Sequence, residues 1–149
     1  SNVMQGYLDQ PEETAKTITA DGWLRTGDLG RMDEDGFVFV TGRIKELIIK
    51  GGENIAPREV DEALLEHDAV LEAAAFARPC QDYGQRVEAC VRLKDGRAVS
   101  ANDLREFCKN LIGAYKTPDH IHFLDDLPKG PSGKIQRMKL IDLAPAANG

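Results

Sequence analysis

Lys134 is a residue whose type and setting could do chemistry on a phosphate. It ends the segment Gly130 to Lys134, which reads G-P-S-G-K. A phosphate-binding loop needs four residues between its glycines and a Ser or Thr after the lysine. Here two residues separate Gly130 from Gly133, and Ile135 follows the lysine, so we exclude a self-contained nucleoside-triphosphate loop. A compact ammonium on a long stem could still act as a point charge on phosphate; the alternative is a solvated surface lysine.

Asp28 is a carboxylate whose position could matter for a ligand. It follows Gly27 on a predicted tight turn, where its side chain would be presented to a bound molecule. The alternative is an aspartate that hydrogen-bonds within its own turn, which is a common use of this residue. Spacing alone leaves both interpretations open.

The stretch from Gly42 to Glu59 combines two separate arginines, two lysines, an apolar run and a Gly-Gly pair. Such a mixture is unusual for a plain strand, because Gly51 and Gly52 give up side-chain packing to gain backbone freedom. The simpler interpretation is a hairpin corner followed by the start of a helix. The return of charge around Arg43 and Lys45 marks a candidate domain boundary.

Neither the histidines nor the cysteines form a recognisable catalytic or metal-binding pattern. His120 and His122 alternate on one predicted strand, but a metal site needs further ligands and none stands nearby in sequence. We therefore predict structural or surface histidines and no metal site. Cys80, Cys90 and Cys108 fit neither a disulfide framework nor a C-x-x-C pair. Reduced thiols in a cytoplasmic protein are the simplest interpretation.

Composition limits the class of protein. The 149 residues carry a net charge of -6, which argues against a general binder of nucleic acid or of anionic membranes. No apolar run approaches the ~20 residues needed to span a bilayer. The hydrophobic content of 42% is enough for a packed core. The chain lacks an initiator methionine and its first two residues, Ser1-Asn2, resemble a tag scar, so we expect a fragment of a longer protein.

The elements that must position these residues can be predicted from local signals. Asp35-Gly36 between two apolar runs predicts a β-hairpin, whose second run, apolar on both faces, should be largely covered. Pro57 should open a helix. Ser100, with Asp103 three residues later, should cap another helix that stops at Gly113. Strands are predicted at 70–77, 87–93 and 121–124, and a short helix from residue 11.

The order helix, strand, strand, helix, strand after residue 46 predicts a small layered α/β domain of the α+β type. Its centre should be a roughly three-stranded sheet flanked by helices. The β-hairpin before it would come from the end of a larger domain. The two prolines and two glycines between 128 and 133 place Lys134 at the end of a mobile, exposed loop.

Three of these segments together resemble ordered signature motifs of the adenylate-forming superfamily. They read W-L-R-T-G-D-L-G at 23–30, G-R-I-K-E-L-I-I-K-G-G-E-N-I-A-P-R-E-V-D at 42–61 and L-P-K-G-P-S-G-K-I at 127–135. The superfamily includes acyl-CoA synthetases, adenylation domains of peptide synthetases, and luciferases. The resemblance covers nearly the whole chain. One departure is Gly130, which stands where the family more often has Thr.

The resemblance implies a two-step reaction in which a carboxylic acid and ATP give an acyl-adenylate and pyrophosphate, and coenzyme A then displaces AMP. It implies that Lys134 bridges the acid and the phosphates in the first step. It places Asp28 at the ribose hydroxyls, Arg43 near the ribose or phosphate, and Lys45 at the hinge between two domains. ATP with Mg²⁺ and coenzyme A are the implied cofactor and co-substrate.

The resemblance also implies that Gly51, Gly52 and Glu53 belong to a loop that enters the active site for the second step and lines the passage for the thiol. Residues 1–44 would be the end of a large AMP-binding domain and 45–149 the mobile C-terminal domain. The partners would be the chain's own N-terminal domain and a carboxylic acid that the sequence does not identify. Without that domain, we expect the chain to be inactive.

Other interpretations stay open. E-N-I-A-P-R-E-V after the Gly-Gly pair fits the CoA ligase branch better than the peptide-synthetase branch. A non-catalytic docking module of the same small fold is a second hypothesis. Lys134 also resembles sites of lysine acetylation in these enzymes, and acetylation would remove its charge.

Overall fold

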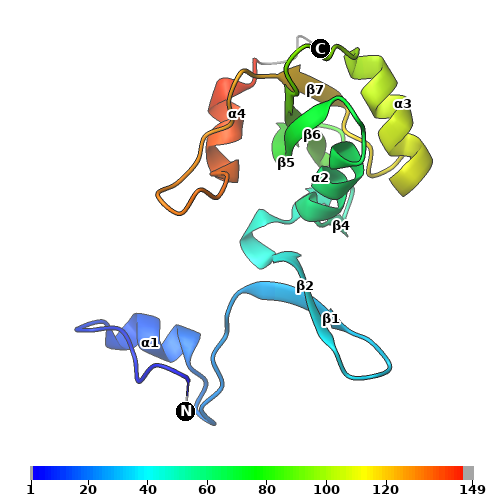
Figure 1. Ribbon diagram of the computed structural model, residues 1–149. Helices are drawn as coiled ribbons and strands as arrows, with labels where there is room; N and C mark the ends of the chain where they lie inside the picture. Colours follow the sequence, from blue (N-terminus) through cyan, green and yellow to red (C-terminus); the bar gives the residue numbers. More distant parts are fainter. Residues whose placement is uncertain (1, 146–149) are drawn as a thin grey trace.

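The computed structural model describes residues 2–145 and shows a small N-terminal part beneath a larger α/β body (Figure 1). The N-terminal part holds helix α1 (Pro11–Thr17) and strands β1 (Asp28–Met32) and β2 (Val38–Arg43). A short 3-10 helix, η1 (Ile44–Glu46), leads from β2 into the larger body. Ser1 of the predicted tag scar lies outside the described residues.

The predicted hairpin is confirmed, but its predicted covering is wrong. β1 and β2 pair antiparallel, and the side chain of Asp33 accepts hydrogen bonds from the backbone N–H groups of Asp35 and Phe37 in the connecting turn. Phe37 is 67% exposed and Val38 is 70% exposed. These apolar side chains stay exposed because the described part of the chain places little else against the hairpin, whose contacts run mainly between its own two strands.

The larger body confirms the predicted α/β class around a five-stranded sheet. Its strands are β3 (Ile48–Lys50), β4 (Glu53–Ile55), β5 (Val70–Cys80), β6 (Gly84–Leu93) and β7 (His120–Phe123). The order is β4-β3-β6-β5, with β7 parallel to β6 on the side of β6 away from β5. The sequence predicted roughly three strands, and β5, β6 and β7 form that centre, with β5 and β6 longer than predicted.

The two additional strands, β3 and β4, form a hairpin joined by Gly51 and Gly52. Both glycines have positive φ, 54° and 87°, which suits a two-residue turn that matches the twist of its strands. Each strand has three residues, too few for an alternation of apolar and polar residues to be visible in sequence.

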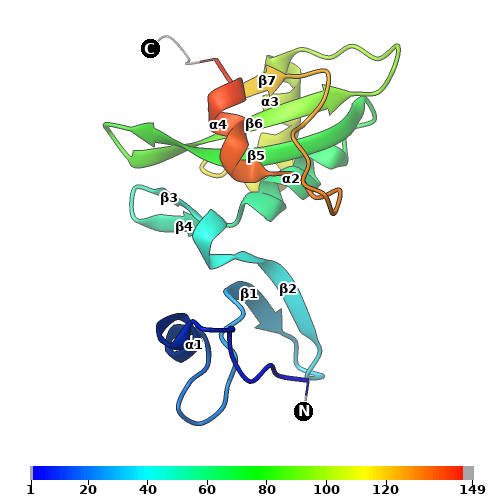
Figure 2. The same ribbon diagram turned by 90° about the vertical axis from the view of Figure 1, so that its left-hand side faces the viewer.

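Helices cover both faces of the sheet. α2 (Pro57–Leu65) and α3 (Ala101–Ile112) pack on one face, while η2 (Arg137–Lys139) and α4 (Leu140–Leu143) lie on the other (Figure 2). Pro57 opens α2, and the Ser100 side chain accepts a hydrogen bond from the Asp103 N–H at the start of α3, as predicted. Leu64 and Leu104 are fully buried in the core under α2 and α3, each contributing about 2 kcal/mol of apolar burial.

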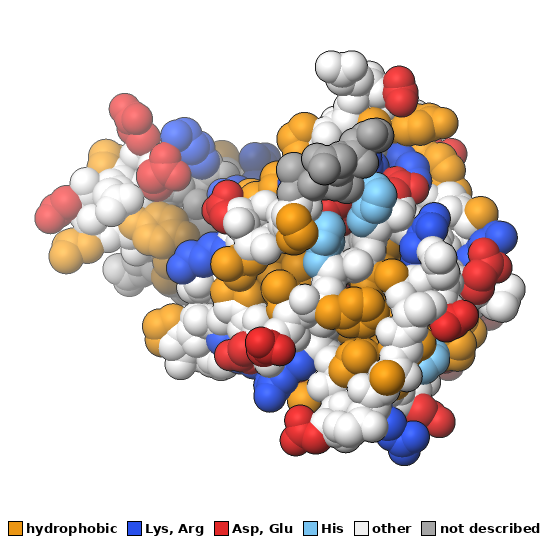
Figure 3. Space-filling view, turned by 90° about the horizontal axis from the view of Figure 1, so that it is seen from above, with side chains coloured by type: hydrophobic (Ala, Val, Ile, Leu, Met, Phe, Trp, Pro, Cys, Tyr) orange, Lys and Arg blue, Asp and Glu red, His pale blue; other side chains and the backbone are white. Residues whose placement is uncertain are grey.

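The surface carries charges of both signs. On the face shown in Figure 3, acidic and basic side chains are interspersed, and the described residues of that face form no broad basic patch. Within residues 2–145, no helix is both long and apolar enough to cross a bilayer.

Candidate functional site

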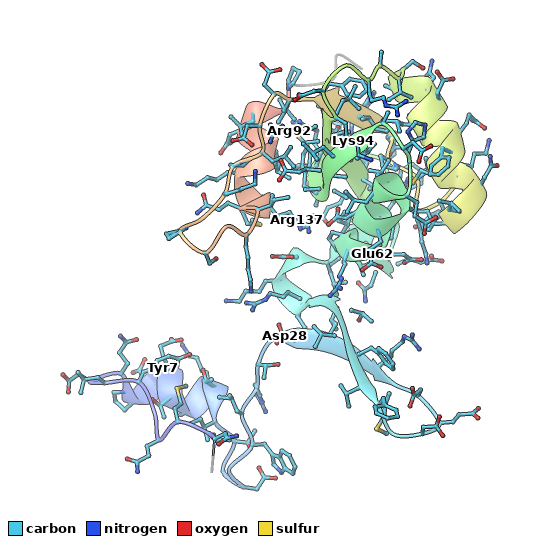
Figure 4. The ribbon with its side chains drawn as sticks, viewed as in Figure 1. Tyr7, Asp28, Glu62, Arg92, Lys94 and Arg137 are labelled. Carbon is cyan, nitrogen blue, oxygen red and sulfur yellow. The ribbon has the colours of Figure 1, made fainter. Side chains whose placement is uncertain are left out.

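An open cavity of about 640 Å³ lies where the N-terminal hairpin meets the larger body. The hairpin contributes Asp28 and Arg43, and the larger body contributes Lys134 and Arg137. Figure 4 shows Asp28 at the upper end of the hairpin, below Arg137. Asp28, Arg43 and Lys134, which the sequence singled out, therefore line one cavity. Asp28 and Lys134 lie more than a hundred positions apart in the sequence.

Asp28 is held by the hairpin and by an arginine. It is the first residue of β1 and pairs in register with Arg43, the last residue of β2. The Arg43 Nε lies 3.2 Å from the Asp28 Oδ1. The N–H of Asp28 donates to the hydroxyl of Thr26, so in this turn it is Thr26 whose side chain bonds the backbone. A carboxylate has about four acceptor positions, and the ion pair with Arg43 leaves capacity for hydroxyl donors.

Lys134 stands on a hydrogen-bonded turn and is exposed, as predicted, while its mobility stays a prediction. The N–H of Gly130 donates to the Lys134 carbonyl at 2.8 Å, and the N–H of Gly133 donates to the Gly130 carbonyl at 2.9 Å. Below the turn, Gln136 N–H donates to the Pro128 carbonyl at 2.7 Å. The glycines and prolines thus build a closed turn, because Gly133 adopts a φ of 77° that other residues rarely take.

Lys134 differs from the other cations of the cavity in its partners. Arg43 pairs with Asp28, Arg58 pairs with Glu62, and the third arginine of the lining is also paired. Among the described residues, Lys134 has neither an ion pair nor a side-chain hydrogen bond, and its side chain is exposed. An unpaired ammonium that lines the same cavity as a carboxylate able to accept hydroxyl donors suits a ligand that carries both phosphate and hydroxyl groups.

Arg137 and Asp61 are two site residues that the sequence reasoning missed. Arg137 donates to Asp61 through two nitrogens, Nη1 to Oδ1 at 3.2 Å and Nη2 to Oδ2 at 2.7 Å. It also donates to the carbonyl of Ala75 in β5, and its Nε lies 3.3 Å from a carboxylate oxygen of Glu46 in η1. Asp61 accepts a further hydrogen bond from the N–H of Ala75 at 2.5 Å.

Burial governs the electrostatics of this pair. Burial raises the pKa of Asp61, while the hydrogen bonds and charge of Arg137 oppose that effect. For Arg137, burial acts to lower the pKa, but its bonds to Asp61 and the charges of Asp61 and Glu46 outweigh it, so the pKa of the guanidinium is raised. The arginine therefore stays charged inside the protein.

A sequence signal for Asp61 did exist. Asp61 lies on the same face of α2 as Val60 and Leu64, which are fully buried. A carboxylate on the apolar face of a helix needs a buried partner, because an unpaired buried charge is strongly unfavourable. The sequence does not show which arginine supplies that partner.

The structure places the remaining predicted residues outside this cavity. Lys45 lies in η1, between the hairpin and the larger body. Gly51, Gly52 and Glu53 belong to the β3–β4 hairpin, which in Figures 1 and 2 lies apart from the loop that carries Lys134. This hairpin lies beside an aromatic pair, Tyr83 and Tyr115, since the Gly51 N–H donates to the Tyr83 carbonyl and the Tyr115 hydroxyl donates to the Lys50 carbonyl.

The two glycines of the β3–β4 turn are constrained differently. A β-carbon on Gly51 would come within 3.1 Å of the Tyr115 hydroxyl oxygen, whereas a β-carbon on Gly52 would meet nothing within 4 Å. Both positions have the positive φ that favours glycine. At Gly52, therefore, the positive φ, and not a lack of space, explains within this chain why glycine is favoured.

Comparison with known proteins identifies the family. Residues 59–134 match the model of the family described as AMP-binding enzyme C-terminal domain. The chain belongs to this family. This AMP-binding C-terminal domain is 53% identical, over 143 residues, to a sulfoacetate–CoA ligase of Cupriavidus necator. The match covers 96% of the chain and 28% of that ligase, so the chain spans little more than a quarter of this relative's length.

Solved structures of one further relative match the AMP-binding C-terminal domain in two states. The ATP-bound structure of MatB from Rhodopseudomonas palustris aligns with a TM-score of 0.89 at 34% identity, over 95% of this chain and 28% of that one. The apo structure of MatB, at the same identity and coverage, aligns with a TM-score of 0.70. The arrangement of the chain thus resembles the ATP-bound structure more than the apo structure.

Proposed function

We propose that the chain is the C-terminal part of an ATP-dependent acyl-CoA ligase. The observation that carries the proposal is that Lys134, whose side chain has no partner among the described residues, lines the same cavity as Asp28. In the first step a carboxylate oxygen attacks the α-phosphorus of ATP, the bond to pyrophosphate breaks, and an acyl-adenylate forms. In the second step the sulfur of coenzyme A attacks the acyl carbon and AMP leaves, which gives a thioester.

Lys134, Asp28 and Arg43 would each have a role in the first step. Lys134 stabilises the negative charge on the oxygens of the reacting carboxylate and phosphate, where a positive group placed in advance is most effective. Asp28 accepts the ribose hydroxyls, and Arg43 holds Asp28 and lies near the ribose or phosphate. Mg²⁺ would arrive with the nucleotide phosphates, and within residues 2–145 no group of three or more His, Cys, Asp or Glu is placed to hold a metal.

Residues 1–44 would end the large AMP-binding domain, and 45–149 would be the mobile C-terminal domain that turns about Lys45. The length of the Cupriavidus ligase supports a large N-terminal partner. The exposed apolar side chains of the β1–β2 hairpin support it too, because Phe37 and Val38 would be covered by that domain. The better match to ATP-bound MatB supports an arrangement that serves the first step.

The second step would use the β3–β4 hairpin. Gly51, Gly52 and Glu53 would enter the active site after rotation about Lys45 and line the passage for the coenzyme A thiol. The distance of this hairpin from the Lys134 turn in the present arrangement supports two poses, because one pose cannot present both segments to a single site.

The pocket that selects the acid would lie in the N-terminal domain. An adenylation domain of a peptide synthetase and a docking module are the alternatives, and a Gly-rich phosphate loop upstream in the full-length protein would exclude the docking module.

Acetylation of Lys134 would silence the first step, and mass spectrometry of the protein from cells would detect it.

The free cysteines, of which Cys90 and Cys108 are buried, support a reducing compartment such as the cytoplasm.

A pyrophosphate-release screen of carboxylic acids with the full-length protein tests the proposal. We expect release that depends on both ATP and one class of acid, followed by AMP release when coenzyme A is added. The 149-residue chain alone should give no release with the same acids. A full-length protein that shows no acid-dependent release with any class of acid would contradict the proposed function.

A further inference from the structure

Arg137 joins the Lys134 turn to three other elements. It follows Lys134 by three residues, and its mostly buried guanidinium contacts α2 through Asp61, β5 through the Ala75 carbonyl and η1 through Glu46. Glu46 is 91 residues away in sequence and directly follows Lys45, the proposed hinge. One side chain thus connects the turn that carries the free ammonium to the segment that leads into the hairpin.

The connection between Arg137 and Lys134 is short and fixed. Three peptide steps span at most about 11 Å, and the two residues between them are held in place. Ile135 packs against the core cluster that contains Leu127 and Leu140, and Gln136 donates its N–H to the Pro128 carbonyl. A displacement of Arg137 would therefore be passed on to the turn.

The contacts at position 137 require a guanidinium and could not be made by a lysine. Its two nitrogens meet the two oxygens of Asp61 at 3.2 and 2.7 Å, the fork geometry of an arginine–carboxylate pair. A lysine ammonium is a single point charge and cannot reproduce the paired contacts together with those to Ala75 and Glu46. An ion pair that served only to neutralise charge would not need this geometry.

A second buried ion pair, which joins strands β5 and β6 of the sheet, provides a comparison. Arg78 donates to Glu88 at 2.6 Å, and Glu88 is fully buried. Neither Arg78 nor Glu88 lines the 640 Å³ cavity. Arg78 also donates to the Ala144 carbonyl, 66 residues away in sequence, so it too links distant segments. This pair resembles Arg137–Asp61 in chemistry and burial but not in location.

We propose that Arg137, held by Asp61, is a positioning residue that fixes the Lys134 turn toward the cavity and ties it to η1 at the hinge. Its catalytic consequence rests on the proposed function. Loss of the guanidinium should loosen the turn and slow the step that needs Lys134, while the step that does not need Lys134 continues. The structural part of the proposal, that the turn depends on Arg137, can be tested without any activity.

The experiment uses the full-length protein with Arg137→Gln, Arg137→Lys, Asp61→Asn and the control Arg78→Gln. Hydrogen exchange is followed in the peptide that contains the turn amides of Gly130, Gly133 and Gln136. In parallel, acyl-adenylate formation and thioester formation from preformed acyl-adenylate are measured separately, and thermal unfolding reports the stability of each variant.

We expect faster exchange in the turn for Arg137→Gln and Arg137→Lys, and a loss of acyl-adenylate formation on the order of 10- to 100-fold, the scale of a displacement of about 1 Å at a reacting group. Thioester formation should be unchanged, and Arg78→Gln should leave exchange in the turn unchanged. If Arg137→Gln does not fold, Asp61→Asn, which keeps the shape of the side chain, decides by the same measurements.

Two results would overturn the proposal: unchanged exchange in the turn, or equal effects of Arg137→Gln and Arg78→Gln on the two half-reactions. Lys134→Ala in the same assays separates this failure from failure of the proposed function. If Lys134→Ala abolishes acyl-adenylate formation and Arg137→Gln does not affect it, only the positioning role is wrong. If Lys134→Ala has no effect, the role of Lys134 is wrong, and if the unaltered protein forms no acyl-adenylate with any class of acid, the proposed function itself is wrong.

Discussion

Asp28 and Arg43 are paired both as opposite residues of an antiparallel hairpin and as an ion pair between their side chains. They are register partners at the open end of the β1–β2 hairpin, and the Arg43 Nε lies 3.2 Å from the Asp28 Oδ1. The arginine side chain is 62% exposed, and exposed ion pairs contribute about 0 to 1 kcal/mol to stability. The pair therefore places a carboxylate at the cavity more than it stabilises the fold.

The first prediction concerns nucleotide binding. In the full-length protein, Asp28→Asn should raise the KM for ATP by about 10- to 100-fold, because one charged hydrogen-bond acceptor contributes about 1.5 to 3 kcal/mol. The melting temperature should change little. Asp35→Asn, in the turn at the opposite end of the hairpin, is the matched control. Equal KM values for ATP in the two variants would exclude Asp28 from the nucleotide site.

The second prediction concerns the β3–β4 turn. Gly52→Leu should block thioester formation from preformed acyl-adenylate while pyrophosphate release continues, because a large side chain would obstruct the passage for the thiol. The positive φ of 87° at Gly52 adds a conformational cost of about 1 kcal/mol or more to any substitution.

Gly96→Leu controls for that conformational cost. Gly96 has a φ of 71° and open space around it, like Gly52, but lies in the turn after β6. If both substitutions reduce thioester formation equally, backbone strain explains the effect and the passage hypothesis is wrong.

The third prediction concerns acid stability. Burial raises the pKa of Glu88, but hydrogen bonds from Arg78 and His122 outweigh burial, and the pKa lies below its ordinary value of 4.5. The folded state then releases the proton more readily than the unfolded state, so Glu88 stabilises the fold above about pH 4.5 and loses that contribution as the pH falls through its lowered pKa.

Urea unfolding of the chain and of Glu88→Gln, from about pH 6 to about pH 3, measures this contribution. The substitution leaves Arg78 and Arg86 without their carboxylate, which at neutral pH should lower the free energy of unfolding by roughly 3 kcal/mol. The variant should then lose less stability than the original chain on acidification. Parallel pH profiles would show that Glu88 is not the group responsible.

Local sequence signals predicted the elements that begin or end at a recognisable residue. Pro57 opens α2, Ser100 caps α3 and Asp35-Gly36 makes the turn of the N-terminal hairpin, because each depends on neighbours within a few residues. The same holds for Asp28 and Lys134, which were found from motifs and which the structure places in one cavity.

Features that depend on distant residues could not be predicted. The pairing of Arg137 with Asp61 joins residues 76 positions apart, and nothing in the sequence near either residue names the other. The exposure of Phe37 and Val38 was also missed. An apolar run predicts that its side chains are buried, but it does not show which part of a longer protein would bury them. β3 and β4 were missed because three residues are too few to show a period.

The most direct test of the account is Lys134→Ala in the full-length protein, with Lys139→Ala, an exposed lysine in η2, as the control. Acyl-adenylate formation is measured as acid-dependent pyrophosphate release, and thioester formation is measured from preformed acyl-adenylate and coenzyme A. We expect Lys134→Ala to abolish the first rate and to leave the second largely intact, while Lys139→Ala changes neither. Equal loss of both rates in Lys134→Ala, or loss of neither, would contradict it.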